Sequence, residues 1–206
     1  MLRNHLCIPG FLALSCLAGL SGCAEMAGIV AGLPNDVPEG LLAVYADPGQ
    51  YGQDVAASDV PAPGTVRDDL RDLSGCWGAY VADAAGGNGL LNIGLYEYWD
   101  FDDATAEFTW WTLQDMGGLL SVATIQTGHF SVVGTDRLQL SIASTRIYDP
   151  LQQAYVAIDD AHDTVEFLAT LDGARLILLM LDNPGDTAPT GSDSAYFTIY
   201  TRMDCR

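Results

Sequence analysis

The stretch LSGCW, residues 73–77, divides the chain into two parts of different character. Downstream of it, apolar and polar residues alternate with a period of two, which is typical of half-buried β-strands. Upstream of it, the chain is rich in Pro, Gly and Ala. The stretch therefore marks where the folded part begins, with Trp77 opening its first strand.

The downstream part is predicted to be all-β. Turn residues such as those at 86–89, 102–103, 134–136, 149–150 and 172–173 separate most of the alternating segments. Short connections make neighbouring strands antiparallel, and closing the sheet removes its exposed edges. We therefore expect an antiparallel up-and-down barrel of about eight strands. The candidate strands are 76–82, 92–101, 104–113, 125–133, 136–147, 153–158, 163–171, 174–181 and 195–204.

A short helix is expected directly before the barrel. Thr65 and Asp68 have the spacing of a helix start. Val66, Leu70 and Leu73 would then share one apolar face, which predicts a two-turn helix ending at Gly75.

The first 22 residues are predicted to be a signal peptide. The apolar run from Leu6 to Leu20 is shorter than the ~20 residues of a comfortable membrane span and fits the core of a signal peptide. The sequence LSGC at 20–23 resembles the bacterial lipoprotein box, which implies that Cys23 is diacylated and becomes the mature N-terminus. The alternative is an ordinary secretory signal with an incidental Cys23. Ala24, where an Asp would resemble a retention signal for the inner membrane, favours the outer membrane.

The resulting localisation is the bacterial cell envelope, with a lipid anchor in the outer membrane and the domain in the periplasm or at the cell surface. Cys7 and Cys16 would leave with the signal peptide, and Cys23 would carry lipid. The two remaining cysteines lie in a compartment that allows disulfides, so we predict a Cys76–Cys205 bridge.

Residues 23–64 are predicted to form a flexible tether, which leaves 65–206 as the barrel domain. This stretch holds five of the nine prolines, namely those at 34, 38, 48, 61 and 63, and it has few residues that could form a core. The segment 41–45, LLAVY, is the exception, because it is apolar enough to dock on the folded part.

Charge excludes one class of partner. Acidic residues outnumber basic ones 27 to 8, the net charge is −19, and the pI is about 4.1. Loss of the signal peptide removes Arg3 and no acidic residue, so the balance becomes 27 to 7, or −20. Nucleic acids and anionic lipid surfaces would be repelled.

Motifs for catalysis are absent from the sequence. It contains no nucleophile motif, phosphate-binding loop or nucleotide fingerprint, so we expect neither an enzyme nor a cofactor. The acidic segment 159–163, with its histidine, could bind a divalent cation, and Ca²⁺ is conceivable in the oxygen-rich loop 182–194. Both lack the ligand spacing of known metal sites, so solvated acidic loops are expected and no metal site is predicted.

Alternation selects the residues that would face the barrel interior. Glu97 shares its face with Trp99, and Arg146 continues the face of Leu138, Leu140 and Ile142. The two charged groups could hold the polar end of a ligand, pair with each other, or lie at the barrel rims in water. Trp99 and Phe130 are further candidates for contact with a ligand. Trp110 and Trp111 must face opposite ways, so one of them needs a cover on the outside.

A family resemblance agrees with the barrel. LSGCW resembles the Gly-x-Trp start of lipocalin-like (calycin) barrels. YWDFDD at 98–103, GHFSVVG at 128–134 and LDGARL at 171–176 resemble the hairpins of small lipocalin-like bacterial lipoproteins. The resemblance implies that Arg202 covers Trp77. If Cys76 lies opposite Cys205, then Trp77 lies opposite Asp204 and Arg202 is its diagonal neighbour.

Two functions follow from this build. The barrel could bind a small apolar or amphipathic ligand. Alternatively, a filled barrel could act through its outer surface on another envelope protein, as inhibitor-type barrels do.

Two segments bear on that choice. Residues 115–123 would form a lid helix over the barrel or a loop plug. The strand 174–181 is apolar on both faces, so it needs a cover from segment 41–45, from the helix 66–73 or from a partner protein, and we favour the first or the last.

Overall fold

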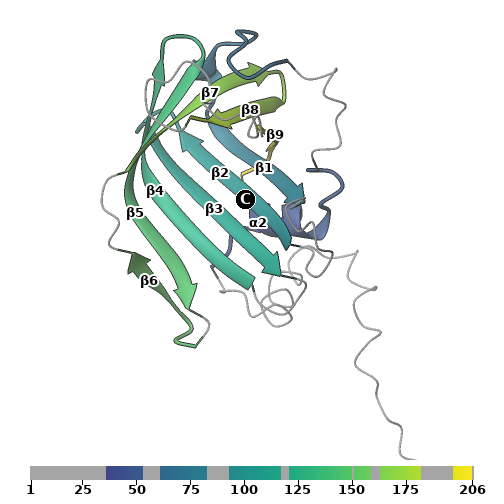
Figure 1. Ribbon diagram of the computed structural model, residues 1–206, viewed down its shortest axis with the longest axis vertical. Helices are drawn as coiled ribbons and strands as arrows, with labels where there is room; N and C mark the ends of the chain where they lie inside the picture. Colours follow the sequence, from purple (N-terminus) through teal and green to yellow (C-terminus); the bar gives the residue numbers. More distant parts are fainter. Residues whose placement is uncertain are drawn as a thin grey trace, which may run out of the picture.

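Eight antiparallel strands close into a barrel, and a ninth strand extends one side of it (Figure 1). The structure is a computed structural model that describes residues 36–52, 61–82, 93–116, 121–149, 151–158, 163–181 and 197–205. The all-β up-and-down barrel predicted from the sequence is thus confirmed. The strands are β1 (Gly75–Ala82), β2 (Ile93–Asp102), β3 (Glu107–Met116), β4 (Ser121–Val133), β5 (Arg137–Asp149), β6 (Ala154–Ile158), β7 (Thr164–Asp172), β8 (Arg175–Met180) and β9 (Thr198–Met203).

β5 is shared between two neighbours on the same side. Its first part, 137–141, pairs with β7, and its last part, 145–149, pairs with β6. Figure 1 shows β7, β8 and β9 gathered at one end of the long strands β2–β5, whose other ends extend past them together with β6. We call this extended side the open end, and the side with the β2–β3 and β4–β5 turns the closed end.

A bulge in β5 reverses the direction of its side chains. The β4–β5 register shifts between Thr127 and Gly128, so that Gly128 is opposite Ile142 while Thr127 is opposite Ser144. The extra residue, Ala143, moves every following side chain to the other face. The strands approach closely here, and a Cβ on Gly128 would lie 2.0 Å from the carbonyl oxygen of Ser141.

The disulfide between Cys76 and Cys205 is present, with a Cα–Cα distance of 5.3 Å. The predicted register around it is wrong by two residues, because Cys76 lies opposite Met203 and Trp77 directly opposite Arg202. Cys205 lies beyond the end of β9, so the bridge reaches diagonally past the last strand pair. A shift of two residues preserves the face of each side chain.

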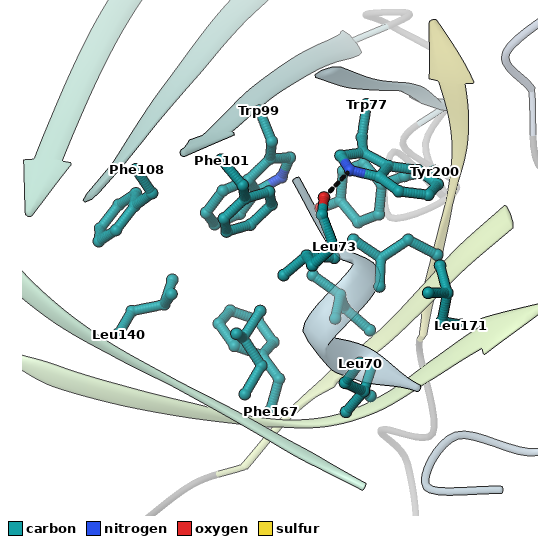
Figure 2. Packing of buried hydrophobic residues seen from close by; sticks show 14 of the residues in the cluster. Leu70, Leu73, Trp77, Trp99, Phe101, Phe108, Leu140, Phe167, Leu171 and Tyr200 are labelled. Atoms are coloured by element: carbon teal, nitrogen blue, oxygen red, sulfur yellow. Dashed lines mark hydrogen bonds between the residues drawn. The ribbon is translucent and has the colours of Figure 1, made fainter. Parts of the chain in front are cut away.

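A single turn closes one end of the barrel. The 3-10 helix η2 (Leu70–Asp72) inserts Leu70, and Leu73 follows it into the core, where its carbonyl accepts a 2.9 Å hydrogen bond from the Trp77 indole (Figure 2). The predicted two-turn helix is therefore too long. The backbone N–H of Asp68 donates to Leu171 of β7 instead of starting a helix, and Val66 is 58% exposed.

Part of the predicted tether is folded. The helix α2 (Glu39–Ala46) lies against β1, β2 and β3 and buries Leu41 and Val44 on the outer face of the sheet (Figure 1). Contact is close at two glycines: a Cβ on Gly40 would lie 2.2 Å from the Tyr98 ring, and one on Gly78 would lie 2.6 Å from Val44. The docking predicted for segment 41–45 is confirmed, and the tether prediction is wrong for residues 36–52. Residues 23–35 and 53–60 lie outside the described residues.

The apolar outer face of β8 is covered within the chain. Ile177 is 0% exposed and Leu179 is 7% exposed. Beside them, the Thr170 hydroxyl of β7 donates to the carbonyl of Ala62, which brings residues 61–64 onto this face. The two favoured covers, segment 41–45 and a partner protein, are both wrong. Segment 41–45 lies in α2, which covers β1–β3, and the burial on β8 requires no partner.

The predicted lid helix is also wrong, because β3 continues to Met116 and β4 already begins at Ser121. None of the helices in the described ranges has the length and apolar character that a membrane crossing requires.

Candidate functional site

Aromatic rings fill the barrel interior toward its closed end. Trp99 of β2 stacks on Trp110 of β3, with centroids 4.4 Å apart and planes at 11°, and on Phe101 at 5.3 Å and 5°. Phe167 and Tyr200 meet the edge of this stack in T-shaped contacts (Figure 2). The polar groups described next lie beside this aromatic stack.

A buried carboxyl lies beside this wall. Glu97 is one inward position away from Trp99 on β2, and it is 5% exposed. Its carboxylate accepts a short hydrogen bond from the hydroxyl of Tyr200 on β9. Glu97 and Tyr200 meet over β1, where the residue opposite Glu97 is the small Ala79. A large side chain at Ala79 would keep the two groups apart.

Burial changes the acidity of both groups. It raises the pKa of Glu97 from 4.5 to about 7, while the hydroxyl of Tyr200 and, less strongly, the indole of Trp99 lower it. Burial, followed by the nearby Glu97 charge, raises the pKa of Tyr200 well above 10. Glu97 therefore changes its charge near neutral pH, and Tyr200 stays protonated as a donor.

Glu97 has no cation beside it among the described residues. The buried charged side chains in this part of the chain are Glu97 and Glu166. Glu166 lies on the outer face and pairs with Arg137, whereas the hydrogen bond of Glu97 is to a neutral phenol. A buried carboxylate without a counter-ion is costly, which explains the high pKa.

Two indole N–H groups in the interior are unsatisfied. Nε1 of Trp99 and Nε1 of Trp110 are buried and have no hydrogen-bond partner of normal geometry, in contrast to Trp77. Buried donors without partners are rare in folded proteins and need an explanation. Trp110 is half-buried, as is Thr112, which lies directly opposite Glu97 on β3. The strand next to the carboxyl is therefore partly accessible to solvent.

The other predicted ligand contacts lie elsewhere. Arg146 does not face the interior, because the β5 bulge places it opposite the outward-facing Ile125, exposed, with its guanidinium 5.8 Å from the ring of Tyr155. Phe130 packs on Phe101 at 5.2 Å near the closed end, away from Glu97. The structure thus brings together Glu97 and Trp99 but neither Arg146 nor Phe130.

The predicted Trp77–Arg202 pair is formed. The Arg202 guanidinium lies 5.2 Å from the centroid of the Trp77 ring and donates to the carbonyl of Ser74 at 2.6 Å. The contact caps the first strand at the closed end and takes no part in the interior site.

Sequence reasoning missed Tyr200 and Trp110. Tyr200 has the same parity as Arg202, so its inward direction followed from the predicted faces of β9. Its contact with Glu97 did not, since 103 residues separate the two and their strands are not neighbours. For Trp110, the sequence required only that it face away from Trp111, which lies on the outer face with Tyr155.

Two other places in the described residues were candidates for a site. Cys76, Asp100 and Cys205 have ligand atoms close together, but the two sulfurs are bonded to each other. A surface depression of about 490 Å³ lies outside the barrel, lined by Gln50, Tyr51, Arg202, Met203 and Asp204. Cys23 and most of the two acidic segments, 159–163 and 182–194, fall outside the described residues.

Comparison of the chain with protein-family models, with curated proteins and with solved structures finds no significant match. The barrel is consistent with a lipocalin-like fold, and membership of the calycin family stays a prediction from sequence motifs. The function must therefore be inferred from the site itself.

Proposed function

We propose that this barrel binds a small amphipathic molecule in its interior, and that its role is binding rather than catalysis. The observation that carries the proposal is the buried polar group formed by Glu97 and Tyr200 beside an aromatic stack in which the indole N–H of Trp110 has no partner. A barrel filled only for stability would replace these groups with apolar ones, because buried polar groups without full partners destabilise the fold. Binding sites combine such convergent polar groups with apolar and aromatic walls.

The shape of the barrel supports the same proposal. Large aromatic side chains fill the closed end, whereas smaller and more polar residues face inward toward the open end, including Thr112, Gln126 and Thr145. An eight-stranded barrel has room for one small ligand when its lining is small. The closed end would then be the rigid base of the site.

The second candidate is the inhibitor-type barrel that acts through its outer surface. One observation favours it: the hairpin formed by β5 and β6 extends beyond the barrel and carries Leu151, 94% exposed, and Val156, 42% exposed. Exposed apolar side chains on an edge strand suit contact with another protein. The two functions are compatible in one molecule.

The proposed place of action is the bacterial envelope. The lipoprotein box and the spacing of residues 1–23 support a lipid anchor at Cys23, in the outer membrane, with the barrel in the periplasm or at the cell surface. Cys23→Ala should release the protein from the membrane fraction of its host; unchanged fractionation would remove the anchor from the proposal.

Native mass spectrometry of protein from its own host tests the binding function. We expect a small-molecule adduct on the wild type and its loss in Thr112→Phe, which places a large ring opposite Glu97. The matched control is His129→Phe on the exposed outer face of β4, which should keep the adduct. A wild-type protein that carries no adduct and takes up none of the amphiphiles offered to it would contradict the proposal.

A further inference from the structure

The part of the chain that the structure describes places no cationic side chain in the barrel interior. All eight basic residues of the chain are Arg, and Lys is absent. None of the described Arg side chains reaches the interior site. Arg146 lies on the outer face, and Arg202 covers Trp77 at the closed end. The others are exposed or paired on the surface, namely Arg67, Arg71, Arg137 and Arg175. An anionic head group entering the site would meet Glu97 without any compensating charge.

The same interior suits a cation. Glu97 is a buried carboxyl without a counter-ion among the described residues, and the side chains of Trp99 and Tyr200 lie beside it. Indole and phenol faces attract ammonium groups through their quadrupoles, and the attraction grows where water is excluded. The net charge of −19 also concentrates cations around the protein.

We propose that the interior site takes a cationic amphiphile, an organic ammonium ion whose head pairs with Glu97 while its apolar part extends past Thr112 toward the open end. This rests on the proposed binding function and adds the charge of the ligand to it. Neutral and anionic amphiphiles of the same length bind more weakly. A neutral head group forms no ion pair with Glu97, and an anionic head group is repelled by the Glu97 carboxylate.

Titration of the carboxyl supports the pairing. Its pKa of about 7 means that Glu97 is largely protonated at pH 5 and ionised at pH 8. Ala79, Thr112, Trp99 and Tyr200 are the described groups that face it from β1, β3, β2 and β9, and none of them titrates between pH 5 and pH 8. The affinity for an ammonium ion therefore rises through this pH range.

The experiment compares three ligands that share an eight-carbon chain: octylammonium, octanol and octanoate. Binding to the purified full-length protein at pH 8 is measured by calorimetry. We expect octylammonium to bind at least about 30-fold more tightly than the other two, because losing one partner of a buried charge pair costs ~2 kcal/mol or more. Glu97→Gln should abolish this preference. Glu107→Gln, which removes the same charge from an exposed position on β3, should preserve it.

Equal binding of octanol or octanoate, with no effect of Glu97→Gln, would overturn the inference and leave the binding function standing. Failure of all three ligands to bind would overturn both. If Glu97→Gln does not fold, the wild type decides alone: the ratio of octylammonium to octanol affinity should rise about 20-fold or more from pH 5 to pH 8, and a flat ratio refutes the pairing with Glu97.

Discussion

Replacing Glu97 with glutamine should change how the stability of the fold depends on pH. Glu97 has a pKa of about 7 in the folded state against an ordinary value of 4.5. Between these two values the unfolded chain releases the proton while the folded chain keeps it, so rising pH favours unfolding. Each pH unit corresponds to ~1.4 kcal/mol, which gives about 3 kcal/mol over the whole interval. The amide side chain of Glu97→Gln does not titrate, so the stability of this variant does not contain this pH-dependent loss.

The contribution of Glu97 is obtained as the difference in the free energy of unfolding between the wild type and Glu97→Gln. Urea unfolding, followed by tryptophan fluorescence without reductant, gives the free energy of unfolding at pH 5, 6, 7 and 8. The wild type should lose about 2.5 kcal/mol relative to Glu97→Gln from pH 5 to pH 8, with most of the change below pH 7. Subtraction cancels the repulsion among the surface carboxylates, which both proteins share.

Glu107→Gln is the control, since its side chain is exposed and it removes the same charge. Its stability should stay parallel to that of the wild type. A constant difference between wild type and Glu97→Gln across this pH range would refute the assignment of Glu97 as a buried, uncompensated carboxyl.

Three further changes test the fold. Gly128→Ala places a methyl group 2.0 Å from a backbone carbonyl of β5 and should lower the free energy of unfolding, measured by thermal unfolding, by about 3 kcal/mol or more. The control Gly173→Ala has open space and a φ of +61°, and should lower it by ~1 kcal/mol. Equal losses would contradict the bulge. Leu41→Asp should release α2, so that limited proteolysis trims the variant to near residue 61 while the wild type stays protected from before residue 41; identical digests would mean that α2 is not docked. The double variant Cys76→Ala/Cys205→Ala opens a loop with a sequence separation of 129 and should lose ~5 kcal/mol by the chain-entropy relation, and a loss below 1 kcal/mol would show that the bridge does not constrain the unfolded chain.

The strands and their closure could be read from the sequence because alternation is a local property. Each predicted strand lies within a few residues of an observed one, and the inward faces of β1, β2 and the first half of β5 are as expected. The disulfide followed from counting cysteines, and the Trp77–Arg202 contact survived a register error of two residues because such a shift preserves parity.

The errors arise where one residue or a distant segment decides the outcome. Ala143 adds a single residue to β5, and nothing in the alternation shows whether the strand continues or bulges there, so Arg146 was assigned to the wrong face. Segment 41–45 looked able to dock, but its position on β1–β3 depends on the glycines at 40 and 78, whose importance appears only when the two surfaces meet.

Two residues of the candidate site could be predicted from the sequence. Glu97 and Trp99 follow from the alternation of β2, which is interrupted by no bulge. The partner of Glu97 does not, because Tyr200 reaches it across an intervening strand and only the small side chain of Ala79 permits the contact. Contacts across a barrel interior depend on closure and on the size of side chains, which local patterns do not specify.

The most direct test of the binding interior is the response of the four tryptophan indole N–H signals in a ¹H–¹⁵N NMR spectrum, assigned with single Trp→Phe variants. On addition of octylammonium, the signals of Trp99 and Trp110 should shift, because the Trp99 indole lies beside Glu97 and Trp110 stacks on Trp99 in the interior. The signals of Trp77, bonded to Leu73, and of Trp111, on the outer face, should stay in place. Shifts confined to Trp111, or no shift at any of the four while binding is detected by calorimetry, would place the ligand outside the barrel and contradict this account.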